Sequence, residues 1–262
     1  MNNHLLLVLL LLGHVLGDFY LQPVRMAAAK DAPLKGAKWG RIVGALIGHG
    51  IIYSAVICVL FIFGTDNSVG LIVWTCLSHF AIDFAKFLIF QTPVRQNDTA
   101  QKLKFAVDQS LHIAVLIILW RIYDPAVAVL DPLSGLAPLL PAMPVPPIVI
   151  ILCLLCGLKP ASMFVKTVLE FIGKPDGDEP GKINDEKMKQ AGKMIGYLER
   201  TIIFFLILCN QFGAIGFVIT AKTVARFSEI RKENAEYYLI GTLSSIAAIF
   251  IISFLLGIWK IP

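Results

Sequence analysis

Four histidines lie in apolar stretches of the sequence, and each has a polar side chain four residues away. The pairs are His14 with Asp18, His49 with Tyr53, His79 with Asp83, and His112 with Asp108. Side chains four residues apart share one face of a helix. Imidazole nitrogens and carboxylate oxygens are the usual ligands of zinc, manganese and iron, and they also relay protons in membrane proteins. The spacing therefore indicates a metal centre or a proton-handling site, provided that the four pairs meet in space.

Each pair belongs to its own apolar segment. These segments cover residues 4–21, 40–63, 69–91 and 105–123. A helix of about 20 apolar residues crosses the ~30 Å hydrocarbon core of a bilayer. Further apolar segments begin near Ile148, Met194 and Tyr237. The sequence therefore predicts an all-α fold, a polytopic transmembrane helical bundle of seven or eight spans.

We expect this bundle to be a single membrane domain over 1–262. Its parts would be a four-span His/Asp bundle (1–124), a Pro-rich external connection (125–147) and the C-terminal spans (148–262) with a cytoplasmic loop at 173–193. The apolar N-terminus has no basic region and no small-residue cleavage site, so we expect a retained span rather than a signal peptide.

The composition is that of a membrane protein. Of 262 residues, 57% are hydrophobic and 16% charged, and the mean hydropathy is +0.75. A soluble domain is nearer half apolar and a quarter charged. The net charge of +5 indicates no nucleic-acid partner, because the cations lie in the predicted loops. The five cysteines all lie in apolar runs, and we interpret them, the Cys153/Cys156 pair included, as packing residues.

Cations alternate between the two sides of the predicted bundle. The loops 22–39 and 92–104 hold seven lysines and arginines, whereas 64–68 and 124–147 hold none. Basic loops remain in the cytoplasm, which places the N-terminus outside. At 1.5 Å per residue, all four histidines then lie ~12–18 Å from the cytoplasmic ends of their spans, and the carboxylates lie one turn nearer that side. We therefore expect one layer of imidazoles beside one layer of carboxylates.

A metal ion would offset the desolvation of three buried carboxylates, Asp18, Asp83 and Asp108, and would lower the pKa of a bound water. The alternative is a structural hydrogen-bond network that joins the helices. For any single histidine we favour the network, and for four at one depth we favour the metal or proton site. A bis-histidine haem would leave the carboxylates unexplained.

The stretch from Met194 to Ile230 allows two topologies. As one helix it would leave Lys222, Arg226 and the cations after them outside the cell, against the positive-inside rule. A break at 210–213 gives two short spans and returns these cations to the cytoplasm, and we prefer it. A re-entrant hairpin buried in protein is the other option.

A second charged cluster would then form near the cytoplasmic face from Glu199, Arg200, Lys222 and Arg226. One interpretation is that these side chains reach the interface as ordinary flanking charges. The other is a cationic entrance that binds a phosphate or a lipid head group.

Several motifs carry a family resemblance. They are GDFYLQ (17–22), SHFAID (78–83) with Lys86, DQSLHI (108–113), GKMIGYLER (192–200), AKTVARFSEI (221–230) and AEYYLIGTLSS (235–245). Together they resemble an uncharacterised family of bacterial multi-pass membrane proteins, a domain of unknown function. The resemblance implies the bacterial inner membrane and brings no activity. The H-x-x-x-D element of His79 and Asp83 is also similar to SOS-induced membrane-bound metal-dependent hydrolases, whose remaining histidine pattern is not evident here.

These observations lead us to expect a metal-dependent hydrolase acting on a membrane-associated lipid or phosphoester. The expected metal ligands are His14, His49, His79, His112, Asp83 and Asp108, with Asp18, Asp83 and Asp108 as ligands or general base. Lys86 would assist catalysis by steadying substrate charge, and Glu199, Lys222 and Arg226 would bind substrate. The rivals are a proton-coupled transporter or channel and a structural partner protein without catalysis. Membrane lipid is the expected partner, and no protein partner is predicted.

Overall fold

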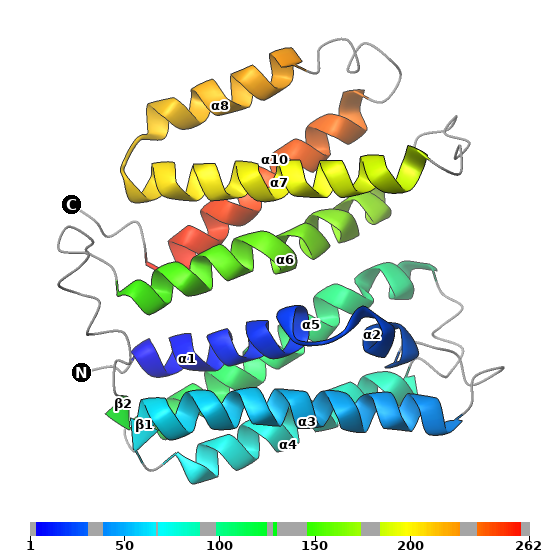
Figure 1. Ribbon diagram of the computed structural model, residues 1–262, viewed down its shortest axis with the longest axis vertical. Helices are drawn as coiled ribbons and strands as arrows, with labels where there is room; N and C mark the ends of the chain where they lie inside the picture. The colour runs from blue at the N-terminus through cyan, green and yellow to red at the C-terminus, as the bar shows by residue number, and fades with distance from the viewer. Residues whose placement is uncertain are drawn as a thin grey trace. The chain divides into compact units, whose positions relative to one another are not determined.

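The computed structural model of the chain describes residues 4–30, 39–66, 68–89, 98–124, 128–129, 146–173, 184–225 and 235–257. These residues are almost entirely helical, which confirms the expected all-α fold (Figure 1). Contacts group the chain into two compact units, Met1–Ile148 and Val149–Pro262, and each is described by itself. That the whole chain forms one membrane domain stays a prediction. Most of the Pro-rich connection lies outside the described residues, as do residues 174–183 of the predicted loop at 173–193. The prediction of a loop over 184–193 is wrong, because these residues form the first turns of a helix, Asn184–Leu208.

The first unit is built from four long helical segments in a ring. Its elements are α1 (His4–Val15), the π-helix η1 (Leu16–Tyr20), α2 (Val24–Lys30), α3 (Trp39–Gly64), α4 (Val69–Ile89) and α5 (Asp98–Tyr123). Helix α1 packs on α3 and α5, α3 packs on α4, and α4 packs on α5, so the ring closes (Figure 1). The expected four-helix arrangement of the His/Asp segments is therefore present.

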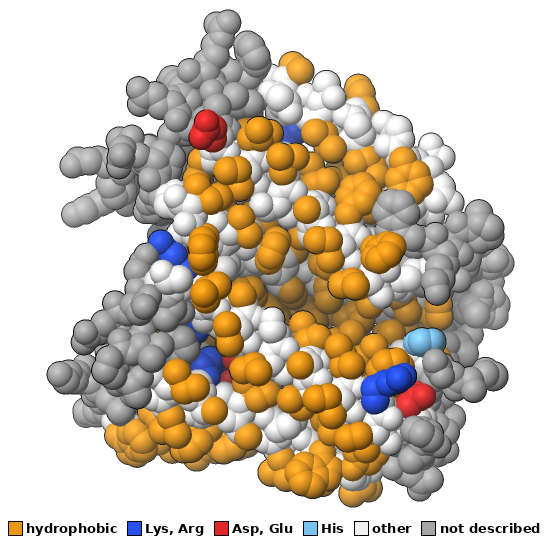
Figure 2. All heavy atoms as spheres, turned by 180° about the vertical axis from the view of Figure 1, so that it is seen from behind, with side chains coloured by type: hydrophobic (Ala, Val, Ile, Leu, Met, Phe, Trp, Pro, Cys, Tyr) orange, Lys and Arg blue, Asp and Glu red, His pale blue; other side chains and the backbone are white. Residues whose placement is uncertain are grey.

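Apolar side chains fill the interior of this ring away from the polar pairs. Leu6, Leu10, Ile57, Phe61 and Leu71 are completely buried. In a bilayer these side chains stabilise the ring by close van der Waals packing rather than by removal from water, because lipid tails are as apolar as they are. The ring's outer surface is also apolar, as is usual where the solvent is lipid. Figure 2 shows apolar side chains spread over the face in view, with few charged ones between them.

The first segment does not continue straight. The NH group of Leu21 donates to the carbonyl of Leu16 at 2.8 Å, which closes a π-turn. Pro23 follows, and it cannot continue a helix because it has no NH group. Its carbonyl instead accepts the first bonds of α2, from Met26 and Ala27. As a result α2 turns by 90° from the axis of the preceding segment.

A two-stranded ladder joins the connection after α3 to the connection after α5. Strand β1 (Thr65–Asp66), directly after α3, pairs antiparallel with β2 (Ala128–Val129). The register is Thr65 opposite Val129 and Asp66 opposite Ala128. This pairing ties the α3–α4 turn to the segment that follows α5.

The second unit contains α6 (Pro147–Ile172), α7 (Asn184–Leu208), α8 (Phe212–Ala225) and α10 (Ala235–Leu255). Helix α7 packs on α8 and α10 (Figure 1). The preferred break near residue 210 is confirmed. Asn210 has φ of +55°, a left-handed conformation that Asn tolerates better than most residues. The bonds Gln211 N to Leu206 O and Asn210 N to Ile207 O cap α7 in the pattern of a Schellman motif.

A buried arginine connects three helices of the second unit. Arg200 of α7 is only 3% exposed. Its guanidinium donates to the carbonyl oxygens of Gly157 and Leu158 and to the hydroxyl oxygens of Ser162 and Ser245. The acceptors belong to α10 and to the part of α6 around Pro160, where a missing NH group disturbs the ladder of backbone bonds. Arg200 is therefore enclosed in protein and is not a flanking charge at an interface.

Five described helices are long and apolar enough to cross a membrane, or six if the bent pair of α1 and α2 counts as one span. This supports a multi-pass membrane protein. Of the seven or eight expected spans, α7 and α8 fall short. Helix α7 is polar over its first half, and α8 has 14 residues, or about 21 Å, which is less than the hydrocarbon thickness.

Candidate metal centre

The four histidines of the first unit converge in the interior of the ring. Each comes from a different helix, and none is more than 2% exposed. The ring centroids of His79 and His112 lie 4.5 Å apart, those of His49 and His79 lie 5.1 Å apart, and those of His14 and His112 lie 5.1 Å apart. The expected meeting of the four imidazoles is therefore observed.

Asp18 lies at the centre of three of these histidines. Its Oδ1 is 2.8 Å from His79 Nε2 and 3.2 Å from His49 Nε2, and its Oδ2 is 3.8 Å from His14 Nδ1. Asp18 belongs to the π-helix η1, in which each turn holds about one residue more than an α-turn. Single π-turns are frequent at functional sites because they shift the direction of side chains. Here the π-turn carries a carboxylate that contacts histidines of α1, α3 and α4.

Tyr53 packs against His79, and Gly17 lies beside Tyr53. The Tyr53 ring stacks on the His79 ring with centroids 3.5 Å apart and planes 23° apart. A Cβ at position 17 would lie 2.6 Å from Tyr53 Cδ2, closer than side-chain carbons approach. The absence of a side chain at Gly17 therefore allows Tyr53 to lie against η1. The stack in turn limits the orientations that the His79 imidazole can adopt.

The other two carboxylates contact lysines. Lys30 Nζ lies 2.5 Å from Asp83 Oδ2, and Lys86 Nζ lies 3.2 Å from Asp83 Oδ1 and 3.0 Å from Asp108 Oδ2. Lys30 is the last residue of α2, and the 90° turn before α2 brings it to Asp83 of α4. Buried charges are expected to be paired in this way because desolvation of an isolated charge is costly.

Several buried polar atoms of this region have no hydrogen-bond partner. They are His14 Nδ1, His49 Nδ1, His112 Nε2, Asp108 Oδ1 and the Tyr53 hydroxyl. Buried polar groups are normally satisfied, so each exception needs a reason. The Nδ1 of His112 lies 2.9 Å from the backbone carbonyl of Asp108, which sets Nδ1 as the protonated nitrogen and leaves Nε2 with a free lone pair. Metal-ligating histidines are usually oriented by such a bond.

These residues fit a divalent metal ion. Three groups each bring three ligand atoms within 4.8 Å of one another. The groups are His14, Asp18 and His79; His49, His79 and Asp83; and Asp83, Asp108 and His112. Ligand atoms bonded at about 2.0–2.2 Å to a tetrahedral zinc lie about 3.3–3.6 Å apart. The 3.2 Å between Asp18 Oδ1 and His49 Nε2 is close to this spacing, whereas the 2.8 Å between Asp18 Oδ1 and His79 Nε2 is a hydrogen-bond distance that would have to lengthen around an ion.

The site predicted from the sequence and the observed cluster share most of their members. All four histidines, Asp18, Asp83, Asp108 and Lys86 lie in the cluster, and their roles remain predictions. Sequence reasoning missed two members. Lys30 was interpreted as a loop cation, and nothing in its spacing distinguishes it from its neighbours. Gln109, which accepts from His14 Nε2 at 3.1 Å, follows Asp108 directly, and a polar pair in an apolar span could have indicated it.

The predicted substrate-binding residues belong to the second unit. Glu199 and Lys222 form an ion pair, with Oε2 and Nζ 2.5 Å apart. Lys193 Nζ and Arg200 Cζ each lie 5.7 Å from the centroid of the Tyr197 ring. Arg226 lies outside the described residues. The binding of substrate by Glu199, Lys222 and Arg226 stays a prediction.

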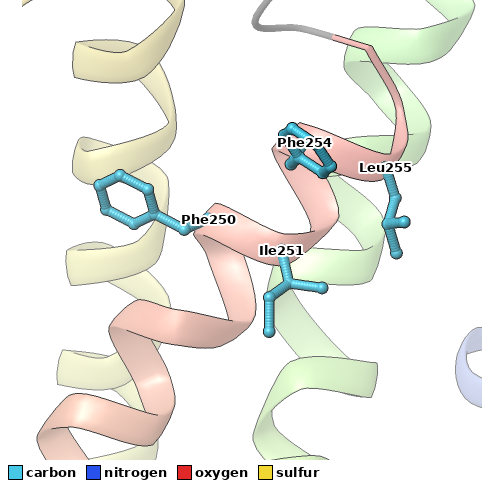
Figure 3. A pocket seen from close by; sticks show the side chains of 4 residues that line it. All are labelled: Phe250, Ile251, Phe254 and Leu255. Atoms are coloured by element: carbon cyan, nitrogen blue, oxygen red, sulfur yellow. The ribbon is translucent and has the colours of Figure 1, made fainter.

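The second unit also has a shallow hollow of about 290 Å³ on α10 (Figure 3). It is lined by Phe250, Ile251, Phe254 and Leu255. All four side chains are apolar, so the hollow offers no group that could bind a metal or take part in acid–base chemistry. It is a feature of an apolar helix surface and not a candidate active site.

Residues 6–132 match a family model described as "Protein of unknown function (DUF3307)". No curated protein and no solved structure matches the chain significantly. The matched segment contains every residue of the cluster, and the match is consistent with an uncharacterised domain family. The motifs at 192–200, 221–230 and 235–245 lie beyond the match.

Proposed function

We propose that the first unit binds a divalent metal ion, zinc, manganese or iron, and hydrolyses a membrane-associated lipid or phosphoester with it. One observation carries the proposal: four buried imidazoles from four helices converge beside the Asp18 and Asp108 carboxylates, and His14 Nδ1, His49 Nδ1 and His112 Nε2 lack hydrogen-bond partners. A purely structural network would be expected to satisfy these atoms. A metal ion would satisfy them as ligands.

Different residues of the cluster would bind the ion, accept a proton and offset the charge of the substrate. Imidazoles and Asp18 hold the ion, which when bound polarises an ester oxygen and lowers the pKa of a coordinated water. Asp108 would serve as the general base through Oδ1, which is buried and makes no hydrogen bond. The ammonium of Lys86 lies between Asp83 and Asp108 and offsets the negative charge of a phosphoester.

The membrane setting supports a lipid or a lipid-linked ester as substrate. The cluster is enclosed by helices whose outward faces are apolar. We place the protein in the bacterial inner membrane with its basic loops in the cytoplasm, on the side of Asp18, Asp83 and Asp108. Activity on a membrane-associated ester would then begin from the cytoplasmic side.

A second candidate is proton-coupled transport. It is favoured by the series of ion pairs from Lys30 through Asp83 and Lys86 to Asp108, which links three helices. Chains of ionisable groups inside a bundle commonly relay protons. The same groups could move protons without any metal.

The deciding experiment uses the full chain purified in detergent. We expect near-stoichiometric metal by elemental analysis, and hydrolysis of bis-p-nitrophenyl phosphate or of phosphatidic acid in mixed micelles. His79→Ala should lose both metal and activity. His4→Ala is the matched control, because His4 lies outside the cluster beside Trp120. Metal-free protein that conducts protons in liposomes would contradict the hydrolase and support the transporter.

A further inference from the structure

The charged groups of the cluster separate into two parts according to whether they contact a lysine. We call His14, Asp18, His49, His79 and His112 the histidine half, and Lys30, Asp83, Lys86 and Asp108 the lysine half. The two halves touch, because His49 Nε2 is 3.4 Å from Asp83 Oδ2 and His112 Nδ1 is 3.6 Å from Asp108 Oδ1.

The histidine half contains no ammonium group. Among the described residues, the Asp18 carboxylate contacts three imidazoles and no lysine. His14 Nδ1, His49 Nδ1 and His112 Nε2, which lack hydrogen-bond partners, also belong to this half. With its imidazoles neutral it therefore has one negative charge and several nitrogen lone pairs, and no lysine among the described residues contacts its carboxylate.

The lysine half already contains its cations. Lys30 contacts Asp83 Oδ2, and Lys86 contacts Asp83 Oδ1 and Asp108 Oδ2, so three of the four carboxylate oxygens lie against an ammonium group. Two carboxylates face two lysines, and the formal charge of this half is zero. A metal ion bound by Asp83 and Asp108 would have to displace these lysines.

The charge of the whole cluster limits how many ions it can hold. Three carboxylates and two lysines give a formal charge of −1. One divalent ion changes this to +1, and a second ion changes it to +3 if both lysines stay. A net charge of +3 inside a helical bundle is strongly unfavourable because the interior solvates charge poorly.

We propose that the chain binds a single divalent ion in the histidine half, and that Lys30 and Lys86 occupy the place of a second ion in the lysine half. This inference rests on the proposed metal-dependent function. It makes Lys30, the residue at the end of α2, a positioning residue that keeps Asp83 out of the metal's ligand set.

The first test is the number of ions per chain. Full-length protein in detergent is loaded with Zn²⁺ or Mn²⁺, desalted and measured by elemental analysis. We expect a ratio of one metal ion per chain. Two ions per chain would overturn the inference and leave the proposed function intact, whereas no bound ion would refute the proposed function itself.

Isosteric variants test the division between the halves. Asp18→Asn removes the carboxylate of the histidine half and should reduce the ratio from one to zero. Asp108→Asn changes only the lysine half, and the ratio should remain at one. Loss of the metal in both variants, with the fold retained by circular dichroism, would overturn the assignment of the ion to the histidine half.

Lysine variants test the substitution of ammonium for metal. The double variant Lys30→Met with Lys86→Met frees Asp83 and Asp108, and we expect its ratio to rise to two. Arg25→Met is the matched control, since it removes a cation from the exposed side of α2, and its ratio should stay at one. A double variant that is folded and still binds one ion would overturn the role given to the lysines. If the double variant does not fold, Lys30→Met alone should bind additional metal that Arg25→Met does not bind, and equal binding by the two would overturn that role.

Discussion

Among the described residues of the first unit, Tyr53 and His79 form the closest ring stack, with centroids 3.5 Å apart. The contact joins α3 to α4 and holds the imidazole whose Nε2 lies 2.8 Å from Asp18. The Tyr53 hydroxyl has no hydrogen-bond partner. The ring of Tyr53, rather than its hydroxyl, therefore orients His79.

This relationship predicts different effects for two substitutions. Tyr53→Leu removes the stack, and we expect metal affinity to fall about 10–100-fold, the usual loss when a residue that orients a ligand is removed. Tyr53→Phe keeps the ring, so its affinity should stay close to that of the wild type. Competition with a chromophoric chelator measures both. Equal affinities for Tyr53→Leu and the wild type would show that the stack does not orient a ligand.

Gly17 should not tolerate a side chain. Gly17→Ala places a Cβ against the Tyr53 ring, and overpacking of this kind costs about 1–3 kcal/mol. Gly44→Ala in α3 is the control, because nothing lies within 4 Å of its added Cβ and a helical Gly-to-Ala change normally stabilises by up to ~1 kcal/mol. Thermal unfolding in detergent compares the two. A Gly17→Ala protein as stable as Gly44→Ala would contradict the steric argument.

Arg200 should be essential for the stability of the second unit. Arg200→Met leaves two hydroxyls and two backbone carbonyls without their donor, and each unsatisfied buried acceptor costs about 1–3 kcal/mol. We expect a large loss of resistance to denaturation, with metal content per folded chain unchanged, because every proposed ligand lies in the first unit. Lys193→Met removes a nearby exposed cation and should have little effect. Equal stability of Arg200→Met and Lys193→Met would show that the hydrogen bonds of Arg200 do not stabilise the second unit.

The alternation of basic loops predicts the orientation in the membrane. Reporter fusions at about residues 30 and 102 should be cytoplasmic, and a fusion near residue 66 should be external. Neutralising Lys102 and Lys104 together should weaken this orientation and produce a mixed population. Fusions that place the segment before α5 outside would invert the topology and remove the argument for cytoplasmic access.

The predictions made from the sequence succeeded where the evidence was local. Histidines and carboxylates four residues apart share a helix face whatever the rest of the chain does. The length of an apolar run, which decides whether its helix can cross the bilayer, is also read directly from the sequence. These features predicted the helical fold and the four polar faces. The break after α7 was predicted from the cations that follow it, and the structure adds the local reason, because Asn210 adopts the left-handed conformation that the cap requires.

The tertiary structure decided which residues meet. Lys30 reaches Asp83 because a π-turn and Pro23 redirect the chain by 90°. Arg200, which the sequence grouped with interface charges, is buried among three helices. These contacts depend on how helices rotate and approach one another. That is set by the packing of side chains distant in sequence, and no spacing along the chain encodes it.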